Sequence, residues 1–137
     1  MTTASGQADE LAIGNDGDVV RVRQLVRTYA TQAKLSLVDQ TKLVTATSEL
    51  ARNTLVYGGG GVATVEMVTD GRRSGVRASF QDEGPGIPDM TLALADGWSS
   101  GKGLGLGLSG AKRLVDDFDL DTEVGRGTRV TVVKWSR

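Results

Sequence analysis

The sequence has no cysteine and no histidine in its 137 residues. Without cysteine, the chain forms no disulfide and performs no thiol chemistry. Without histidine, it has no imidazole base, no histidine metal ligand and no residue that could become phosphohistidine. These absences exclude disulfide scaffolds, thiol enzymes and histidine-based catalysis, and they allow a reducing compartment.

Excess charge and long apolar runs are also missing. Sixteen basic residues nearly balance 17 acidic ones, whereas a nucleic-acid-binding domain shows a basic excess or stripe. No apolar run could span a membrane, and residues 1–10 lack the basic start and apolar stretch of a secretory signal. We therefore expect a cytoplasmic protein with no nucleic-acid or membrane partner. The composition of residues 1–10 predicts a disordered tail, and the length of the chain predicts a single domain over residues 11–137.

Apolar periodicity predicts the order of helices and strands. A first helix is expected with Asp18 as its N-cap, although the valines at 19–22 would also fit a strand. A second helix is expected to end near Val56, because the glycines at 58–61 follow it. A third helix is expected to begin near Leu104, and a short helix is expected over residues 90–96. The expected strands are residues 11–13, 62–69, 76–82, 119–124 and 128–135.

Four glycines alternate with long side chains between Gly101 and Leu108, just before the third helical pattern. Glycine lets backbone N–H groups approach an anion, and a helix N-terminus adds partial positive charge. The stretch therefore suggests a phosphate site, with a tight turn packed on the core as the alternative. It is no Walker A loop, because Gly103 stands where Ser or Thr is required. Residues 88–101 could form a mobile lid over a nucleotide.

Three polar residues lie at the edge of the expected core. Glu49 and Asn53 are four residues apart on the second helix, and their side chains therefore lie side by side. Their oxygens suit Mg²⁺, and an ordinary polar pair at a helix boundary is the alternative. Asp82 continues the apolar face of Val76 and Phe80, so its carboxylate needs a partner. That partner is either a protein donor or the amino group of a ligand base.

Three motifs follow one another in the sequence: Glu49-x-x-x-Asn53, Asp82-x-Gly84-x-Gly86 and Gly101-x-Gly103-Leu-Gly105-Leu106. In this order they resemble the Bergerat-fold (GHKL) ATPase superfamily, which includes gyrase, Hsp90, sensor histidine kinases and mismatch-repair ATPases. The resemblance implies an α/β fold, a two-layer sandwich of a mixed β-sheet with helices on one face. It also implies that ATP binds between the helices and a lid.

Within this superfamily, the chain is too short for the multidomain enzymes, and it lacks the histidine of a sensor kinase. Residues 47–53, 82–89, 111–118 and 127–135 resemble RsbT-type serine/threonine switch kinases. The closely related anti-sigma-factor kinases are the alternative, together with a catalytically silent ATP-sensing module. The implied activity is ATP- and Mg²⁺-dependent phosphorylation of Ser or Thr on STAS-domain partners in sigma-factor or stress signalling. A PP2C-type phosphatase or a sigma factor is an implied further partner.

The resemblance also assigns roles to residues of this chain. It implies that Asn53 coordinates Mg²⁺, and that Glu49 approaches the metal through water and orients or deprotonates the acceptor hydroxyl. It further implies that Asp82 accepts a hydrogen bond from the adenine amino group, with Thr128 beside it. The other implied nucleotide contacts are Gly84, Gly86, Ile87, Lys102, Gly103, Leu104, Gly105, Leu106 and Gly107.

Overall fold

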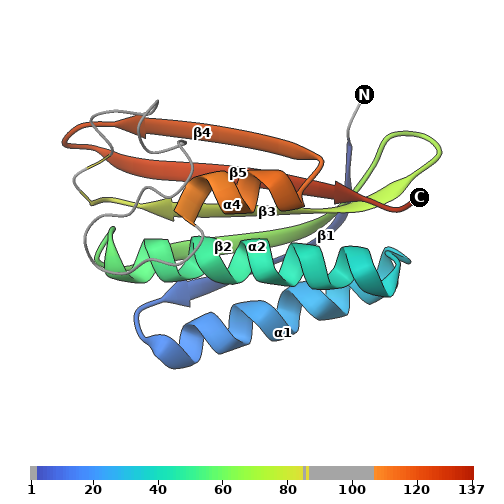
Figure 1. Ribbon diagram of the computed structural model, residues 1–137, viewed down its shortest axis with the longest axis horizontal. Coiled ribbons are helices and arrows are strands. Elements are labelled where there is room, and N and C mark those ends of the chain that lie inside the picture. Colours follow the sequence, from blue (N-terminus) through green and yellow to red (C-terminus); the bar gives the residue numbers. More distant parts are fainter. Residues whose placement is uncertain (1–2, 85, 87–106) are drawn as a thin grey trace.

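The computed structural model describes residues 3–84, 86 and 107–137, with side chains from residue 7 onward. The chain forms a five-stranded sheet with helices packed on one face, as predicted (Figure 1). None of the described helices is long and apolar enough to cross a membrane. The elements are β1 (Thr3–Ile13), α1 (Asp16–Gln32), α2 (Leu37–Val56), β2 (Gly61–Thr69), β3 (Ser74–Asp82), α4 (Gly107–Leu114), β4 (Asp117–Glu123) and β5 (Gly127–Trp135).

The sheet has the strand order β1-β2-β3-β5-β4, and every described pairing is antiparallel. The prediction of a mixed sheet was therefore wrong in this detail. The helices α1 and α2 form a hairpin between β1 and β2, so the chain returns to the end of the sheet that it left. The strands β3 and β4 do run parallel, but β5 lies between them and pairs antiparallel with both.

The main core lies between the sheet and the helices. Alternate residues of β3, among them Val76 and Phe80, point toward the helices, and the intervening Ser79 and Gln81 point to the opposite face. The largest fully buried side chains in this layer are Tyr29, Phe80, Ile13, Leu43, Leu50, Val22, Val26, Val65, Val76 and Val132. The predicted strand alternation of residues 62–69 and 76–82 is confirmed.

The N-terminal part of the chain differs from the prediction. Residues 1–10 were expected to be a disordered tail, but Thr3–Ile13 forms the edge strand β1. The predicted strand at residues 11–13 is the last part of β1. Residues 3–10 have no apolar alternation, so their place is set by pairing with β2 and by contacts with α1. The Tyr29 hydroxyl donates to Asp9 Oδ2 at 2.7 Å. Burial and the Asp9 carboxylate raise the pKa of Tyr29 to about 12, which keeps the phenol a donor.

Two helix boundaries also differ. The N-cap of α1 is Asn15, whose Oδ1 accepts from the Asp18 N–H at 3.0 Å. Asp18 instead lies in the first turn, where its carboxylate accepts from the Gly14 N–H at 2.8 Å. The third predicted helix is shorter than expected, because α4 ends at Leu114 and Phe118 packs on the core from β4. Phe118 lies at helical spacing from the apolar residues before it, but it fits the inward face of a strand equally well, which explains why the helix was predicted too long.

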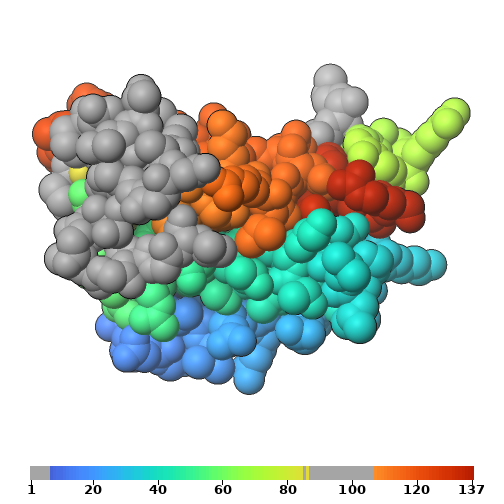
Figure 2. All heavy atoms as spheres, viewed as in Figure 1, coloured from blue at the N-terminus to red at the C-terminus, as the bar shows by residue number. Residues whose placement is uncertain are grey.

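A buried charge cluster fixes the first turn of α2 to the end of β5. The side chain of Lys134 is only 5% exposed, and its ammonium lies 3.6 Å from Asp39 and 3.7 Å from Asp116. Arg137 pairs with the same two carboxylates from a more exposed position. The C-terminal end of the chain consequently lies beside the start of α2 (Figure 2). This cluster orients the helix that carries Glu49 and Asn53.

We expect Lys134→Ala to lower the free energy of unfolding by about 3–5 kcal/mol, because it leaves two partly buried carboxylates with less compensation. Arg137→Ala is the control, since the side chain of Arg137 is 58% exposed and an exposed pair contributes about 1 kcal/mol or less. Urea denaturation of both variants measures the difference. Equal losses would show that the burial of Lys134 adds nothing to the cluster.

Candidate functional site

The C-terminal half of α2 carries two buried oxygens without a hydrogen-bond partner. Among the described residues, Glu49 Oε2 and Asn53 Oδ1 are the buried side-chain oxygens left unsatisfied. Leaving such an atom unpaired costs about 1–3 kcal/mol, and buried polar atoms in native proteins are therefore almost always bonded. One helical turn separates the two residues, so both oxygens are available to one ligand on the same side of α2. A carboxylate and an amide oxygen fit a hard cation such as Mg²⁺.

Asp82 lies at the end of β3, in the middle of the sheet. The antiparallel register sets it opposite Gly61 of β2 and opposite Thr128 of β5. Its Oδ1 accepts a hydrogen bond from the Gly84 N–H at 2.9 Å. The sequence prediction placed Thr128 beside Asp82, and the strand register brings these two residues together.

The Asp82 carboxylate is half-buried, and this burial determines its acidity. Burial raises the pKa of the Asp82 carboxyl above its ordinary value, and the backbone N–H groups of Gly84 and Thr128 oppose the increase. The sequence left two possible partners for the Asp82 carboxylate, a protein donor or the amino group of a ligand base. The structure shows that protein donors are present. The same group retains acceptor capacity, because a carboxylate has about four lone-pair sites on its two oxygens.

Glycines surround Asp82, and side chains at these positions would collide with Asp82 or with a neighbouring glycine. A Cβ on Gly58 would lie 2.5 Å from the Asp82 Cβ and 2.6 Å from its Oδ2. A Cβ on Gly84 would lie 2.8 Å from the Gly58 Cα. A Cβ on Gly127 would overlap the Asp82 carbonyl. The end of α2, the end of β3 and the start of β5 therefore pack against one another through glycines.

The other predicted glycines have different surroundings. Gly86 has a φ of +77°, and a Cβ there would lie 2.8 Å from the carbonyl carbon of Glu123. This glycine is thus required for packing on the end of β4, which the sequence did not suggest. Gly107 is buried and begins α4 with a φ of +64°. The remaining predicted contacts, and the predicted lid over residues 88–101, lie outside the described residues; those contacts are Ile87, Lys102, Gly103, Leu104, Gly105 and Leu106.

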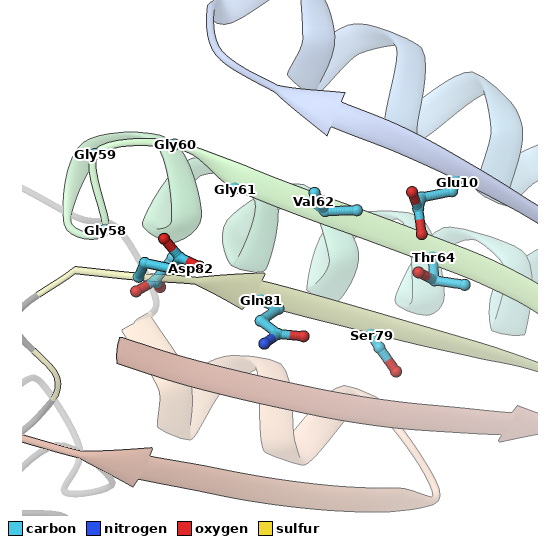
Figure 3. Close-up of a pocket in the computed structure, with 11 residues that line it drawn as sticks. Glu10, Gly58, Gly59, Gly60, Gly61, Val62, Thr64, Ser79, Gln81 and Asp82 are labelled. Atoms are coloured by element: carbon cyan, nitrogen blue, oxygen red, sulfur yellow. The ribbon is translucent and has the colours of Figure 1, made fainter. Parts of the chain in front are cut away.

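A cavity of about 620 Å³ adjoins Asp82 on the face of the sheet that faces away from the helices. Polar side chains of neighbouring strands, Thr64, Ser79 and Gln81, line its floor (Figure 3). The glycines at 58–61 form its end wall. The cavity therefore shares the glycine turn and Asp82 with the candidate site, whereas Glu49 and Asn53 do not line it.

Sequence reasoning missed one part of this site. The glycines at 58–61 were treated only as the end of the second helix, yet Gly58 contacts Asp82 and the whole run lines the adjoining cavity. The available signal was their position, since the run begins five residues after Asn53 and directly precedes the strand that pairs with β3.

Comparisons with known proteins agree with this fold and show the family of the chain. The family described as histidine kinase-, DNA gyrase B-, and HSP90-like ATPase matches residues 38–136. The serine/threonine-protein kinase RsbT of Bacillus subtilis (strain 168) is 43% identical over 125 residues, which cover 91% of this chain and 94% of that protein. A crystal structure of the RsbU and RsbW domains of a Mycobacterium tuberculosis protein matches with a TM-score of 0.67 and 22% identity. That match covers 96% of this chain and 32% of the larger one, and it shows a shared fold.

We expect Asp82→Asn to make the unliganded protein more stable at pH 7. Because the native pKa of Asp82 is raised, ionisation destabilises the fold once the pH exceeds both the unfolded and the native pKa values. The difference between variant and wild type should disappear below about pH 3.5, where both states bind the proton. Thermal unfolding across this range measures the effect.

The control is Asp119→Asn on the exposed face of β4, which should change the free energy of unfolding by no more than about 0.5 kcal/mol. An Asp82→Asn variant that is less stable than wild type at pH 7 would contradict the prediction. The hydrogen bonds from Gly84 and Thr128 would then outweigh the effect of burial.

Proposed function

Because the chain belongs to the histidine kinase-, DNA gyrase B-, and HSP90-like ATPase family and is a protein serine/threonine kinase within it, we propose that it phosphorylates a STAS-domain partner protein. The γ-phosphoryl group of ATP is transferred to a serine or threonine hydroxyl of that partner. The observation that carries the proposal is the pair of buried, unpartnered oxygens on α2, Glu49 Oε2 and Asn53 Oδ1. Phosphoryl transfer asks mainly for positioning and charge neutralisation, which a metal ligand and one carboxylate can provide.

Asp82 binds the base in this proposal. Its carboxylate accepts a hydrogen bond from the 6-amino group of adenine, and Thr128 lies beside it in the sheet. The Thr128 hydroxyl is 2.9 Å from the Thr122 hydroxyl, which orients it at this edge of the site. The half-buried position of Asp82 strengthens a bond to the ligand, because a hydrogen bond is stronger where water is partly excluded.

The two residues on α2 act on the phosphates and on the acceptor. Asn53 Oδ1 would hold Mg²⁺, which neutralises phosphate charge when it is bound, and Glu49 would contact the metal through water. Glu49 also orients the attacking hydroxyl and accepts its proton as a general base. The buried Glu49 Oε2 supports this role, because it accepts no hydrogen bond in the described part of the chain and is therefore free to accept a proton.

The partners are proposed from the resemblance to switch kinases and from the similarity to RsbT. STAS-domain proteins are the proposed phosphoacceptors. Once the kinase is released from its STAS-domain partner, it is proposed to bind and activate a PP2C-type phosphatase. The proposed setting is the cytoplasm, with ATP and Mg²⁺ as cofactors. If the chain works as an anti-sigma factor, its proposed second partner is a sigma factor instead of the phosphatase.

We expect Glu49→Gln to bind ATP with nearly wild-type affinity and to lower the rate of phosphoryl transfer by about 10²–10⁴-fold, as for the loss of a general base. Ser48→Ala is the matched control, because the Ser48 hydroxyl is already bonded to the Val44 carbonyl within α2. Transfer of labelled phosphate to candidate STAS-domain proteins measures the rate. Wild-type transfer by Glu49→Gln would refute the proposed base. A wild-type chain that binds ATP and a sigma factor without transferring phosphate would support the anti-sigma alternative.

Asp82→Asn should weaken ATP binding by about 10- to 150-fold, because a hydrogen bond to a charged group is worth about 1.5–3 kcal/mol. Calorimetric titration with a non-hydrolysable ATP analogue and Mg²⁺ measures the dissociation constant. Asp119→Asn again serves as the control, since it removes a carboxylate from the exposed face of β4. Undiminished binding by Asp82→Asn would remove the adenine assignment.

A further inference from the structure

We infer that Gly58 is a positioning residue of the nucleotide site, which holds the Asp82 carboxylate in place and fixes its distance from Asn53. The inference rests on the proposed function, in which Asp82 binds the base and Asn53 the metal. Gly58 was not among the residues that the sequence assigned to the site. It lies in the turn between α2 and β2, directly after Tyr57, which caps the helix.

The Asp82 side chain occupies the space that a side chain on residue 58 would need. A Cβ on Gly58 would lie 2.5 Å from the Asp82 Cβ and 2.6 Å from its Oδ2, and it would overlap the Cγ. Real Cβ atoms essentially never approach other heavy atoms within 3.0 Å. Even alanine at this position must therefore displace the carboxylate or the turn.

Backbone conformation does not explain this glycine. Gly59 and Gly60, the next two residues of the turn, have φ values of +76° and +108°, which L side chains rarely adopt. Gly58 has no positive φ, so its backbone would accept any residue. The requirement for glycine at position 58 therefore comes from the contact with Asp82.

The same residue is bonded to the turn of helix that carries the metal ligand. The Gly58 N–H donates to the Asn53 carbonyl at 3.1 Å, and the Tyr57 N–H donates to the same oxygen at 2.9 Å. On its other side, Gly58 packs against Gly84, whose N–H donates to Asp82 Oδ1. Gly58 thus joins the end of α2 to the end of β3, and with them the phosphate and base ends of the proposed site.

The expected result of Gly58→Ala is a loss of base recognition. The added methyl group displaces the Asp82 carboxylate, and the dissociation constant of ATP with Mg²⁺ should rise about tenfold or more. The decisive readout is the preference for ATP over purine riboside triphosphate, which lacks only the 6-amino group. Wild type should prefer ATP by about tenfold or more, and Gly58→Ala should bind the two nucleotides almost equally.

Gly14→Ala is the matched control. Gly14 also lacks a positive φ, and a Cβ there would meet nothing nearer than 3.7 Å. It should keep the wild-type preference between the two nucleotides. A purely structural role for Gly58 would lower both affinities together and leave the preference unchanged, which would overturn the inference.

The thermal midpoint tests the contact independently of nucleotide binding. Gly58→Ala should lower the midpoint in the wild-type background and lower it much less in an Asp82→Gly background, where the overlapping atoms are gone. Equal shifts in the two backgrounds would overturn the inference. If wild type shows no preference for ATP, the adenine assignment of Asp82 fails, and these midpoints still decide whether Gly58 is fitted to the Asp82 side chain.

Discussion

The site depends on the register of β3 between β2 and β5. This register pairs Asp82 with Gly61 on one side and with Thr128 on the other. Because side chains alternate along a strand, a slip of one residue would turn Asp82 to the face without helices. Phe80 and Val76 prevent that slip, since the same shift would expose both of these buried side chains. The hydrophobic core therefore fixes where the carboxylate points.

Helix α2 is the second fixed element, and three kinds of interaction hold it. Its first turn is paired with Lys134 through Asp39, and its apolar residues pack in the core. Its last turn continues into Gly58, which contacts Asp82. Each end of the helix is thus tied to a different end of the sheet. Glu49 and Asn53 lie on a helix rather than on a loop, which suits their proposed role of holding a metal and a phosphate in position.

The sequence predicted those elements that bury a periodic apolar face. Helix α2 and strands β2, β3 and β5 were found in this way. The location of the helices on one face of the sheet was instead implied by the resemblance to a known superfamily. Only residues 11–13 of strand β1 were predicted, because the rest of the strand is held by its pairing with β2 and its bond to Tyr29, and neither is visible in its own composition. The all-antiparallel pairing depends on β5 lying between β3 and β4, and strand order is not encoded by local periodicity.

The candidate site could be proposed from the sequence in part because its residues break the rules that hold elsewhere in the chain. A carboxylate on an apolar strand face and polar residues at a buried helix shoulder are local inconsistencies. In the structure they remain unfavourable for stability: Glu49 Oε2 and Asn53 Oδ1 have no described partner, and burial raises the pKa of Asp82. Gly58 escaped notice because glycine after a helix also obeys the ordinary rule for helix ends. A residue that satisfies local rules while serving the site can be recognised only from its contacts.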